Sequence, residues 1–259
     1  MEASSEDFKA HGVPPEGMVA SSSHLAILVE SGTEVTQPPL NDLSVIPWLP
    51  MTVEVSVARS VLQRLRTGIC FAIVGDSEFL VNCCLGEACT NKSNLKKLLN
   101  IAQEALKQLA QGFSVKPFLH KQLVIHTPRG DNSAADAAAN RALDEGDFWN
   151  VYPEEVHSFC QYLHQHREDQ NIGLLFSFDG ASRGNPGAAS HGNCGWWGEW
   201  SSNQFCQKGL LYEKGCTIGR HSNNVAEVRG LAFSAKSALH FLFWLCETCA
   251  ELAASRRYV

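Results

Sequence analysis

The sequence predicts an α/β protein in which the strands of a sheet are flanked by amphipathic helices. The clearest strand signal is Leu174 to Asp179, where apolar side chains alternate and lead into a turn-forming segment, Gly180 to Gly187. The clearest helix signal is Asn94 to Gln111, which carries an apolar stripe at helical spacing. A third observation is repetition: Glu54 and Glu227 each precede a similar apolar stripe, which indicates two related units.

The composition is typical of a globular protein. Of the 259 residues, 44% are hydrophobic and 19% are charged, which suffices for one large domain or two small ones. The net charge of −6 opposes nonspecific attraction to nucleic acid. Any contact with a polyanion must therefore be local or mediated by metal ions, because bound divalent cations invert the field of an acidic site.

The ten cysteines are interpreted as reduced thiols, because the sequence does not open with the pattern of a signal peptide. We therefore expect a cytoplasmic or nuclear protein. The single Cys-x-x-Cys motif, Cys246 to Cys249, has no second pair at zinc-finger spacing and is interpreted as buried thiols. The apolar run Leu239 to Cys246 is too short to span a bilayer, so no membrane partner is expected.

The elements of the first part of the chain follow from local patterns. Residues 1–23 are rich in Ser, Glu, Gly and Pro and are expected to form a frayed terminus. The segment His24 to Gln37 has the pattern of a hairpin. A helix is expected after Glu54, although glutamate is also favoured at a helix start by the backbone dipole alone. A strand near Gln122 to His126 then leads to another helix.

The second part of the chain follows a linker, residues 147–171. Within it, Pro153 to Glu168 has apolar residues at helical spacing, so the linker is expected to be partly helical. Two further strands are expected at Gly195 to Trp200 and at Gln204 to Tyr212, and the helix that contains Glu227 follows them.

Two motifs carry a resemblance to a known family: DGASRGNPG at Asp179 to Gly187, and SNNVAEVRGL at Ser222 to Leu231. Together and in this order, they resemble two signatures of the type-1 ribonuclease H family. In that family the first strand supplies an aspartate, the helix after the third strand supplies a glutamate, and both bind divalent metal. The resemblance assigns these roles to Asp179 and Glu227.

The other motifs that resemble the family lie upstream instead of downstream. The segment FAIVGDSEFLVN, at Phe71 to Asn82, is similar to the family's fourth strand and implies a third carboxylate at Asp76. The segment HTPRGDNSAADAAAN, which begins at His126, is similar to the family's last loop and helix. It implies a functional histidine at His126, an asparagine at Asn132 and a fourth carboxylate at Asp136.

The resemblance implies two tandem, imperfect units, each related to a ribonuclease-H-like mixed five-stranded sheet flanked by helices. Residues 24–146 would form a nearly complete unit that lacks the first-strand aspartate and has Glu54 in the place of the family's glutamate. Residues 172–259 would form the N-terminal half of a second unit, truncated at its C-terminal side, with Cys249 where a third aspartate belongs. Residues 147–171 would join the two units.

Neither unit holds four carboxylates, but their acidic residues are complementary. Asp179 and Glu227 of the second unit could complete Asp76 and Asp136 of the first. This composite site would arise within one chain as a permuted fold, or between two chains as a swapped homodimer.

The activity that the resemblance implies is hydrolysis of the RNA strand of an RNA–DNA hybrid. Two Mg²⁺ ions (or Mn²⁺) roughly 4 Å apart can activate a water and stabilise the leaving oxygen of a phosphodiester. The metal ligands would be oxygen donors, as Mg²⁺ prefers, and the candidates are Asp179, Glu227, Asp76 and Asp136. Glu54 is a further catalytic candidate, and His126 in the loop could move protons.

Recognition of the hybrid can depend on the 2′-hydroxyls of its RNA strand and on phosphate contacts that carry no sequence information. The candidate substrate-binding residues belong to the two downstream motifs and to the loop after His126, and they are Gly180, Ser182, Arg183, Asn185, Asn223, Asn224 and Asn132. Turn formation and helix capping are the structural alternatives for the asparagines. The functional alternative is a module without catalysis that binds nucleic acid or protein, which the incomplete units and the acidic balance favour.

Overall fold

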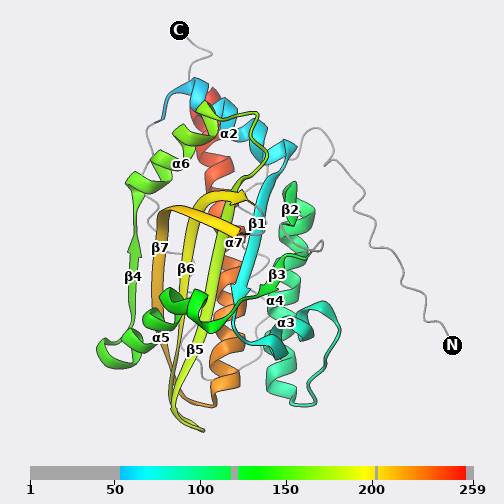
Figure 1. Cartoon of the computed structure of the whole chain (residues 1–259), viewed down its shortest axis with the longest axis vertical. Coiled ribbons are helices and arrows are strands. Elements are labelled where there is room, and N and C mark those ends of the chain that lie inside the picture. Colours follow the sequence, from blue (N-terminus) through cyan, green and yellow to red (C-terminus); the bar gives the residue numbers. More distant parts are fainter. Residues whose placement is uncertain (1–52, 118–121, 202–203, 255–259) are drawn as a thin grey trace, which may run out of the picture. The chain divides into compact units, whose positions relative to one another are not determined.

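The computed structural model describes residues 53–117, 122–201 and 204–254. These residues form an α/β fold in which a mixed seven-stranded sheet is flanked by helices (Figure 1). The α/β class and the mixed sheet agree with the prediction from the sequence. The expected frayed terminus, residues 1–23, and the expected hairpin, His24 to Gln37, lie outside the described residues.

The strands in chain order are β1 Ile69–Gly75, β2 Val115–Pro117, β3 Val124–His126, β4 Phe148–Val151, β5 Ile172–Gly184, β6 Gly187–Ser201 and β7 Gln204–His221. The helices are α2 Val55–Thr67, α3 Glu78–Leu85, α4 Ser93–Gly112, α5 Ser133–Glu145, α6 Pro153–Gln165 and α7 Asn223–Ala254, with the 3-10 helix η2 at Arg129–Asn132. Among the described residues, no helix has both the length and the hydrophobicity needed to cross a membrane.

Strand β5 lies at the centre of the sheet, whose strand order is β2-β1-β5-β6-β7-β4. It pairs in parallel with β1 on one edge and antiparallel with β6 on the other. Strands β2 and β3 both pair in parallel with the outer edge of β1, β2 beside its first half and β3 beside its second half. The direction of pairing therefore changes at β5.

The single seven-stranded sheet differs from the expected pair of units, one nearly complete and one truncated, each related to a five-stranded sheet. Strands β1 to β3 come from the first expected unit and β5 to β7 from the second, yet all six belong to one sheet. The physical reason lies in β5, where Leu174 and Phe176 are fully buried on one face and Leu175 is buried on the other. A strand that is apolar on both faces is unfavourable at an exposed edge, and β1 covers that edge.

Strand β5 is also longer than predicted. The sequence indicates a turn from Gly180 onward, but the ladder with β6 continues as far as the pair of Gly184 and Gly187. Asn185 and Pro186 form the turn itself. Five residues that were expected in a loop, Gly180 to Gly184, therefore extend the strand beyond Asp179.

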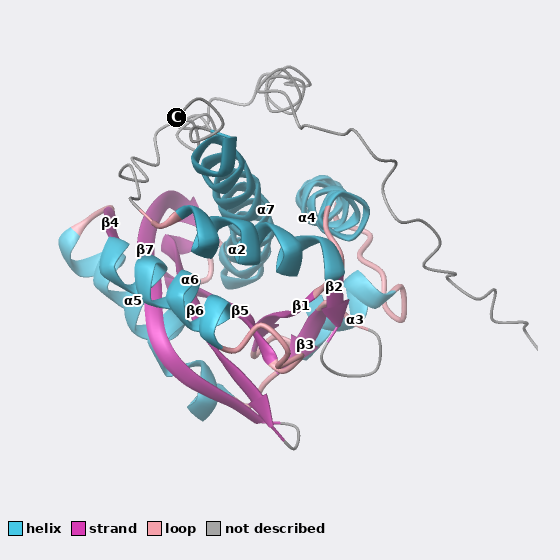
Figure 2. Cartoon of the chain, turned by 90° about the horizontal axis from the view of Figure 1, so that it is seen from above, coloured by secondary structure: helices cyan, strands magenta, loops and turns pink. Residues whose placement is uncertain are grey.

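Helices cover both faces of the sheet (Figure 2). Successive residues of a strand point to opposite faces, so two neighbours on β6 show which helix covers which face. A Cβ added to Gly192 would lie 2.1 Å from the backbone oxygen of Ala135 in α5. The next side chain, Asn193, donates hydrogen bonds to Gly230 and Ser234 of α7. Helices α5 and α7 therefore lie on opposite faces, and α2 and α4 pack against α7.

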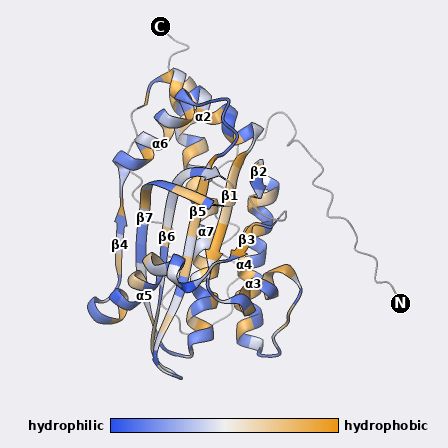
Figure 3. Ribbon diagram, in the orientation of Figure 1, coloured by the Kyte–Doolittle hydropathy of each residue, from blue (hydrophilic) through white to orange (hydrophobic). Residues whose placement is uncertain are grey.

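The larger hydrophobic core lies on the α7 face of the sheet. Phe176 of β5 is buried there between Phe71 of β1 and Tyr212 of β7, with ring centroids 5.5 and 6.0 Å away. Figure 3 shows that hydrophobic residues follow one another along β1. The other face carries a smaller buried cluster, Ala72, Val74, Leu175 and Trp200. Apolar packing on both sides holds β1 and β5 in fixed register, which positions the residues that follow them.

Candidate active site

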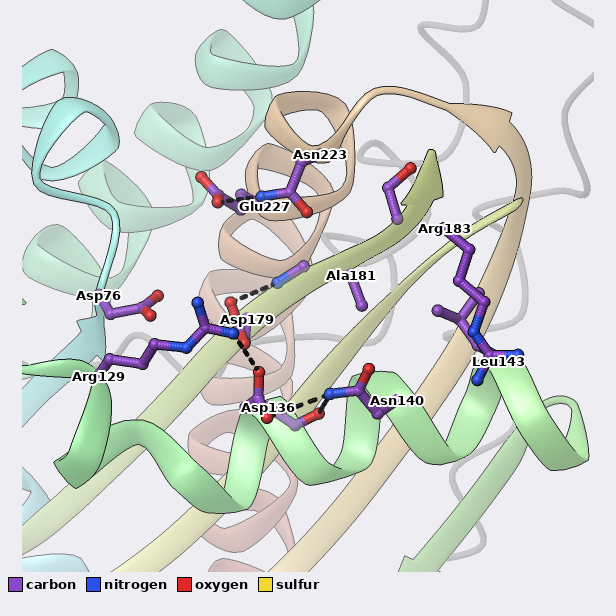
Figure 4. Close-up of a pocket in the computed structure, with 12 residues that line it drawn as sticks. Asp76, Arg129, Asp136, Asn140, Leu143, Asp179, Ala181, Arg183, Asn223 and Glu227 are labelled. Atoms are coloured by element: carbon purple, nitrogen blue, oxygen red, sulfur yellow. Dashed lines mark hydrogen bonds and ion pairs between the residues drawn. The ribbon is translucent and has the colours of Figure 1, made fainter. Parts of the chain in front are cut away.

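The candidate site is a pocket at the carboxyl end of β1, beside Asp179 within the neighbouring parallel strand β5 (Figure 4). Val74 of β1 is paired with Ser177 of β5. Asp76, which follows the last residue of β1, and Asp179, two residues beyond Ser177, therefore emerge beside each other at the same end of the sheet. Pockets in open α/β sheets form at such positions, where the strand order changes direction.

Two helices bring further carboxylates to this pocket from opposite faces of the sheet. Asp136 lies in the first turn of α5, and Glu227 lies in the first turns of α7. All four acidic side chains line the pocket, Asp76 and Asp136 from the upstream half of the chain and Asp179 and Glu227 from the downstream half. The structure thus brings together the four residues of the composite site within one chain.

The glycine after Asp179 allows α7 to approach the strand closely. A Cβ added to Gly180 would lie 2.2 Å from the backbone nitrogen of Glu227. This distance is far shorter than a van der Waals contact, so only glycine fits at this position. Gly230 lies one helical turn further along α7, and a Cβ added there would lie 2.9 Å from the backbone oxygen of Asp179. Gly180 therefore places Glu227 next to Asp179, a packing role in addition to the substrate contact that the motif suggests.

Asp179 is the most deeply placed carboxylate of the site, with 5% of its surface exposed. Burial raises the pKa of Asp179 to about 8, and the negative charges of Asp76 and Asp136 act in the same direction. The backbone N–H of Gly180 donates to its Oδ1 at 2.8 Å and partly offsets this effect. Burial is therefore the main cause that disfavours the ionised form of Asp179, and the neighbouring carboxylates add to it.

Glu227 is held by two polar contacts. The amide of Asn223 donates to its Oε1 at 2.6 Å, one helical turn earlier in α7. Burial raises the pKa of Glu227, and the charge of Asp76 adds to this, whereas a hydrogen bond with Ser77 and the charge of Arg129 oppose it. Ser77 follows Asp76 directly, so the end of β1 contacts α7 at this point.

Asp136 has two partners that the sequence did not single out. The guanidinium of Arg129, in η2, lies 3.1 Å from its Oδ1. The amide of Asn140 donates to its Oδ2, also at 3.1 Å, and reaches it because the two residues are four apart on α5. Helical spacing could have indicated Asn140 as a partner, and Arg129 lies inside the quoted loop motif without a family role.

The donor set of the pocket fits a hard divalent cation, because carboxylate oxygens are the ligands that Mg²⁺ prefers. The side chains do not yet converge as ligands: in the described part of the chain, no three His, Cys, Asp or Glu residues are grouped closely enough to hold a metal ion. Asp136 contacts Arg129 and Asn140 and also shares a hydrogen bond with Asp179. Glu227 is hydrogen-bonded to Asn223 and Ser77. A cation bound at Asp136 Oδ1 would compete with the guanidinium of Arg129.

Two predicted catalytic residues lie outside the pocket lining. Glu54 stands at the N-cap position of α2, where its backbone oxygen accepts the bond from Ala58, so helix initiation accounts for it. His126, the last residue of β3, is exposed and pairs with Gly75, immediately before Asp76. It therefore lies beside the end of β1 without contributing to the pocket wall.

The predicted substrate-binding residues divide into three groups. Gly180, Ser182, Arg183 and Asn223 line the pocket. Asn185 and Asn224 are exposed and lie outside the lining. Asn132 is buried, and its amide donates to the backbone oxygen of Phe178 at 2.9 Å, which ties the loop before α5 to the strand that carries Asp179.

The polar contacts of the lining residues are largely structural. Ser182 donates to the backbone oxygen of His221 at 3.0 Å, and Arg183 forms an ion pair with Asp144 at the rim.

The sequence matches no protein-family model, and a search of curated proteins finds no match.

Proposed function

We propose that this protein is a metal-dependent ribonuclease H that hydrolyses the RNA strand of RNA–DNA hybrids. The observation that carries the proposal is the meeting of Asp76, Asp136, Asp179 and Glu227 at one pocket. These four residues were selected by motif resemblance in two segments that are far apart in the chain. Their common position supports a two-metal nuclease, because the main chemical contribution of such an enzyme is clustered carboxylates.

The order of the elements supports a permuted ribonuclease-H-like fold. Strands β5, β6 and β7 followed by α7 correspond to the first three strands and the glutamate-bearing helix of the resemblance. Strands β1 and β3 followed by α5 correspond to its fourth strand, last loop and last helix. The two segments occur in exchanged order along the chain but share one sheet. A swapped homodimer is then not needed to assemble the site.

Asp179, Asp76, Glu227 and Asp136 would hold two Mg²⁺ or Mn²⁺ ions. Bound there, the cations would supply Lewis-acid stabilisation of the attacking water and of the leaving oxygen of the phosphodiester. Asp179 would be ionised in this state, because positive charge beside a carboxylate lowers its pKa. His126, exposed beside the end of β1, would move a proton to or from the reacting oxygens.

The rim of the pocket supplies groups suited to a nucleic-acid backbone. The Arg183 side chain is 57% exposed, so it can exchange its partner Asp144 for a phosphate. A guanidinium can bind a phosphate through two parallel hydrogen bonds. Asn223 offers an amide beside Glu227, where a 2′-hydroxyl of the RNA strand could be recognised. These contacts read the backbone and not the bases, so the enzyme would tolerate many sequences.

A cleavage assay on an RNA–DNA hybrid with labelled RNA tests the proposal. Mg²⁺-dependent cleavage is expected, and Asp179→Asn and Asp76→Asn should each reduce its rate at least about 100-fold. Asp131→Asn is the matched control, since Asp131 is exposed, precedes Asp136 by five residues and does not line the pocket. Cleavage that survives both pocket substitutions, or that needs no divalent cation, would remove the proposal.

The second candidate is a binding module without catalysis. The engagement of Asp136 by Arg129 and the net charge of −6 favour it. The same assay separates the two candidates, because a module would retain the hybrid without cutting it. In either case we propose a cytoplasmic or nuclear setting.

A further inference from the structure

Arg129 is the cation that faces the acidic pocket. Its guanidinium lies 3.1 Å from Asp136 Oδ1, and Figure 4 shows it between Asp136 and Asp76. The negative charges of Asp136, Asp179 and Asp76 all raise the pKa of Arg129, and its own charge lowers the pKa of Glu227. One guanidinium therefore interacts with all four carboxylates.

The contact of Arg129 with Asp136 is easily exchanged. The Arg129 side chain is 79% exposed and extends from the short helix η2, whereas Asp136 is 31% exposed. An ion pair at this level of exposure is weak, because water screens it and the long side chain gains entropy when it is released. Arg183, the other pocket-lining arginine, pairs with Asp144 instead of with the four carboxylates.

We propose that Arg129 is a resident counter-cation that competes with the first divalent metal ion for Asp136, and that a substrate phosphate draws it away. The inference rests on the proposed function and adds a coupling between metal and nucleic acid. Without nucleic acid, the metal must displace a positive charge from the pocket. With nucleic acid bound, the guanidinium has a phosphate partner and Asp136 is free for the metal. By linkage, each ligand then increases the affinity for the other by the same factor.

The coupling predicts effects of opposite sign when the charge is removed. Arg129→Gln should bind Mn²⁺ about twofold to fivefold more tightly than the wild type in the absence of nucleic acid, the range for a weak exposed ion pair. In EDTA, the variant should bind an RNA–DNA hybrid more weakly than the wild type. The slope of log affinity against log salt concentration should become shallower by about 0.7 to 0.9, the value for one lost phosphate contact. A purely structural role of Arg129 would weaken both.

The experiment uses the full chain, with Mn²⁺ binding followed by electron paramagnetic resonance of the free ion and hybrid binding followed by fluorescence anisotropy. The matched control is Arg141→Gln, because Arg141 lies on the next helix, α5, and pairs with Glu145 at 2.8 Å but does not line the pocket. It should leave both affinities unchanged. Arg129→Lys keeps the charge and should keep both near wild-type values, and circular dichroism checks the fold of each variant.

The outcomes separate this inference from the proposed function. Tighter Mn²⁺ binding together with weaker hybrid binding in Arg129→Gln supports it. Mn²⁺ binding that depends on Asp179 but is unchanged or weaker in Arg129→Gln overturns the role of Arg129 and leaves the proposed function standing. Mn²⁺ binding that is absent, or unaffected by Asp179→Asn, overturns both.

Discussion

Asp76 and Asp179 emerge side by side from two adjacent parallel strands, although one belongs to the upstream half of the chain and the other to the downstream half. Their proximity, together with burial, raises the pKa of Asp179 to about 8. The same proximity predicts that the stability of the fold depends on pH. The predictions below test these relationships.

The first prediction concerns pH. The pKa of Asp179 is about 8 in the folded protein and close to 3.8 when unfolded, so the folded state binds the extra proton between these values. The free energy of unfolding should therefore fall as pH rises from about 4 to about 8 without metal. Asp179→Asn removes the charge and keeps the oxygen that accepts from Gly180, so it should stabilise the metal-free protein at pH 8 by about 2–4 kcal/mol and do little at pH 4.

Urea unfolding in EDTA at several pH values measures this effect. Asp131→Asn, at an exposed position, should follow the wild-type curve. If Asp179→Asn lowered the free energy of unfolding equally at pH 4 and pH 8, the pKa of Asp179 would not be raised in the folded protein.

The second prediction concerns the contact between β5 and α7. Gly180→Ala would force a methyl group against the backbone of Glu227, which cannot move without shifting the helix. We expect a loss of about 2–4 kcal/mol in the free energy of unfolding, together with loss of activity. Gly130→Ala is the control, because a Cβ there meets nothing within 4 Å, and it should change the stability by less than about 0.5 kcal/mol. Equal stabilities of the two variants, by thermal or urea unfolding, would contradict the close approach.

The third prediction separates a structural asparagine from a surface one. Asn132→Ala removes the buried hydrogen bond to the backbone oxygen of Phe178, which should cost about 1–3 kcal/mol. Asn140→Ala removes an exposed contact with Asp136 and should cost less than about 0.5 kcal/mol. Urea unfolding measures both. A stable Asn132→Ala variant that binds the hybrid weakly would return this residue to the role of a substrate contact.

The fourth prediction concerns the single sheet. A fragment of residues 172–254 alone would expose the edge of β5 that β1 covers, including the positions paired with Phe71 and Ile73. We expect it to aggregate or remain unfolded, and a fragment of residues 53–146 to behave likewise. Mixing the fragment of residues 53–146 with a longer fragment of residues 147–254 should restore a cooperative unfolding transition. Independent folding of either fragment, shown by sharp amide resonances, would favour two tandem units.

The local elements were readable from the sequence because their signals are short in range. The stripe from Asn94 to Gln111 corresponds to α4, and the linker pattern from Pro153 corresponds to α6. The pairing of β1 with β5 was not readable, because hydrophobic alternation identifies a strand but not its neighbour. The two-unit interpretation counted the carboxylates of each half separately for this reason.

The candidate site also has features that local sequence patterns predict and others that they do not. The four acidic residues that the motifs indicate all line the pocket, because each stands next to a recognisable strand end or helix start. The environment of these residues could not be predicted from the sequence: Asn132 proves to be buried, and Arg129 forms an ion pair with Asp136. Both properties depend on how η2 packs against β5, which no local pattern specifies.

The position of β5 between β1 and β6 has a consequence for biosynthesis. A ribosome releases β1 long before β5, so the edge of β1 that pairs with β5 stays unpaired until β5 has been translated. Chaperones that shield nascent chains would act on this edge, and the pocket can assemble only after α7 has left the exit tunnel.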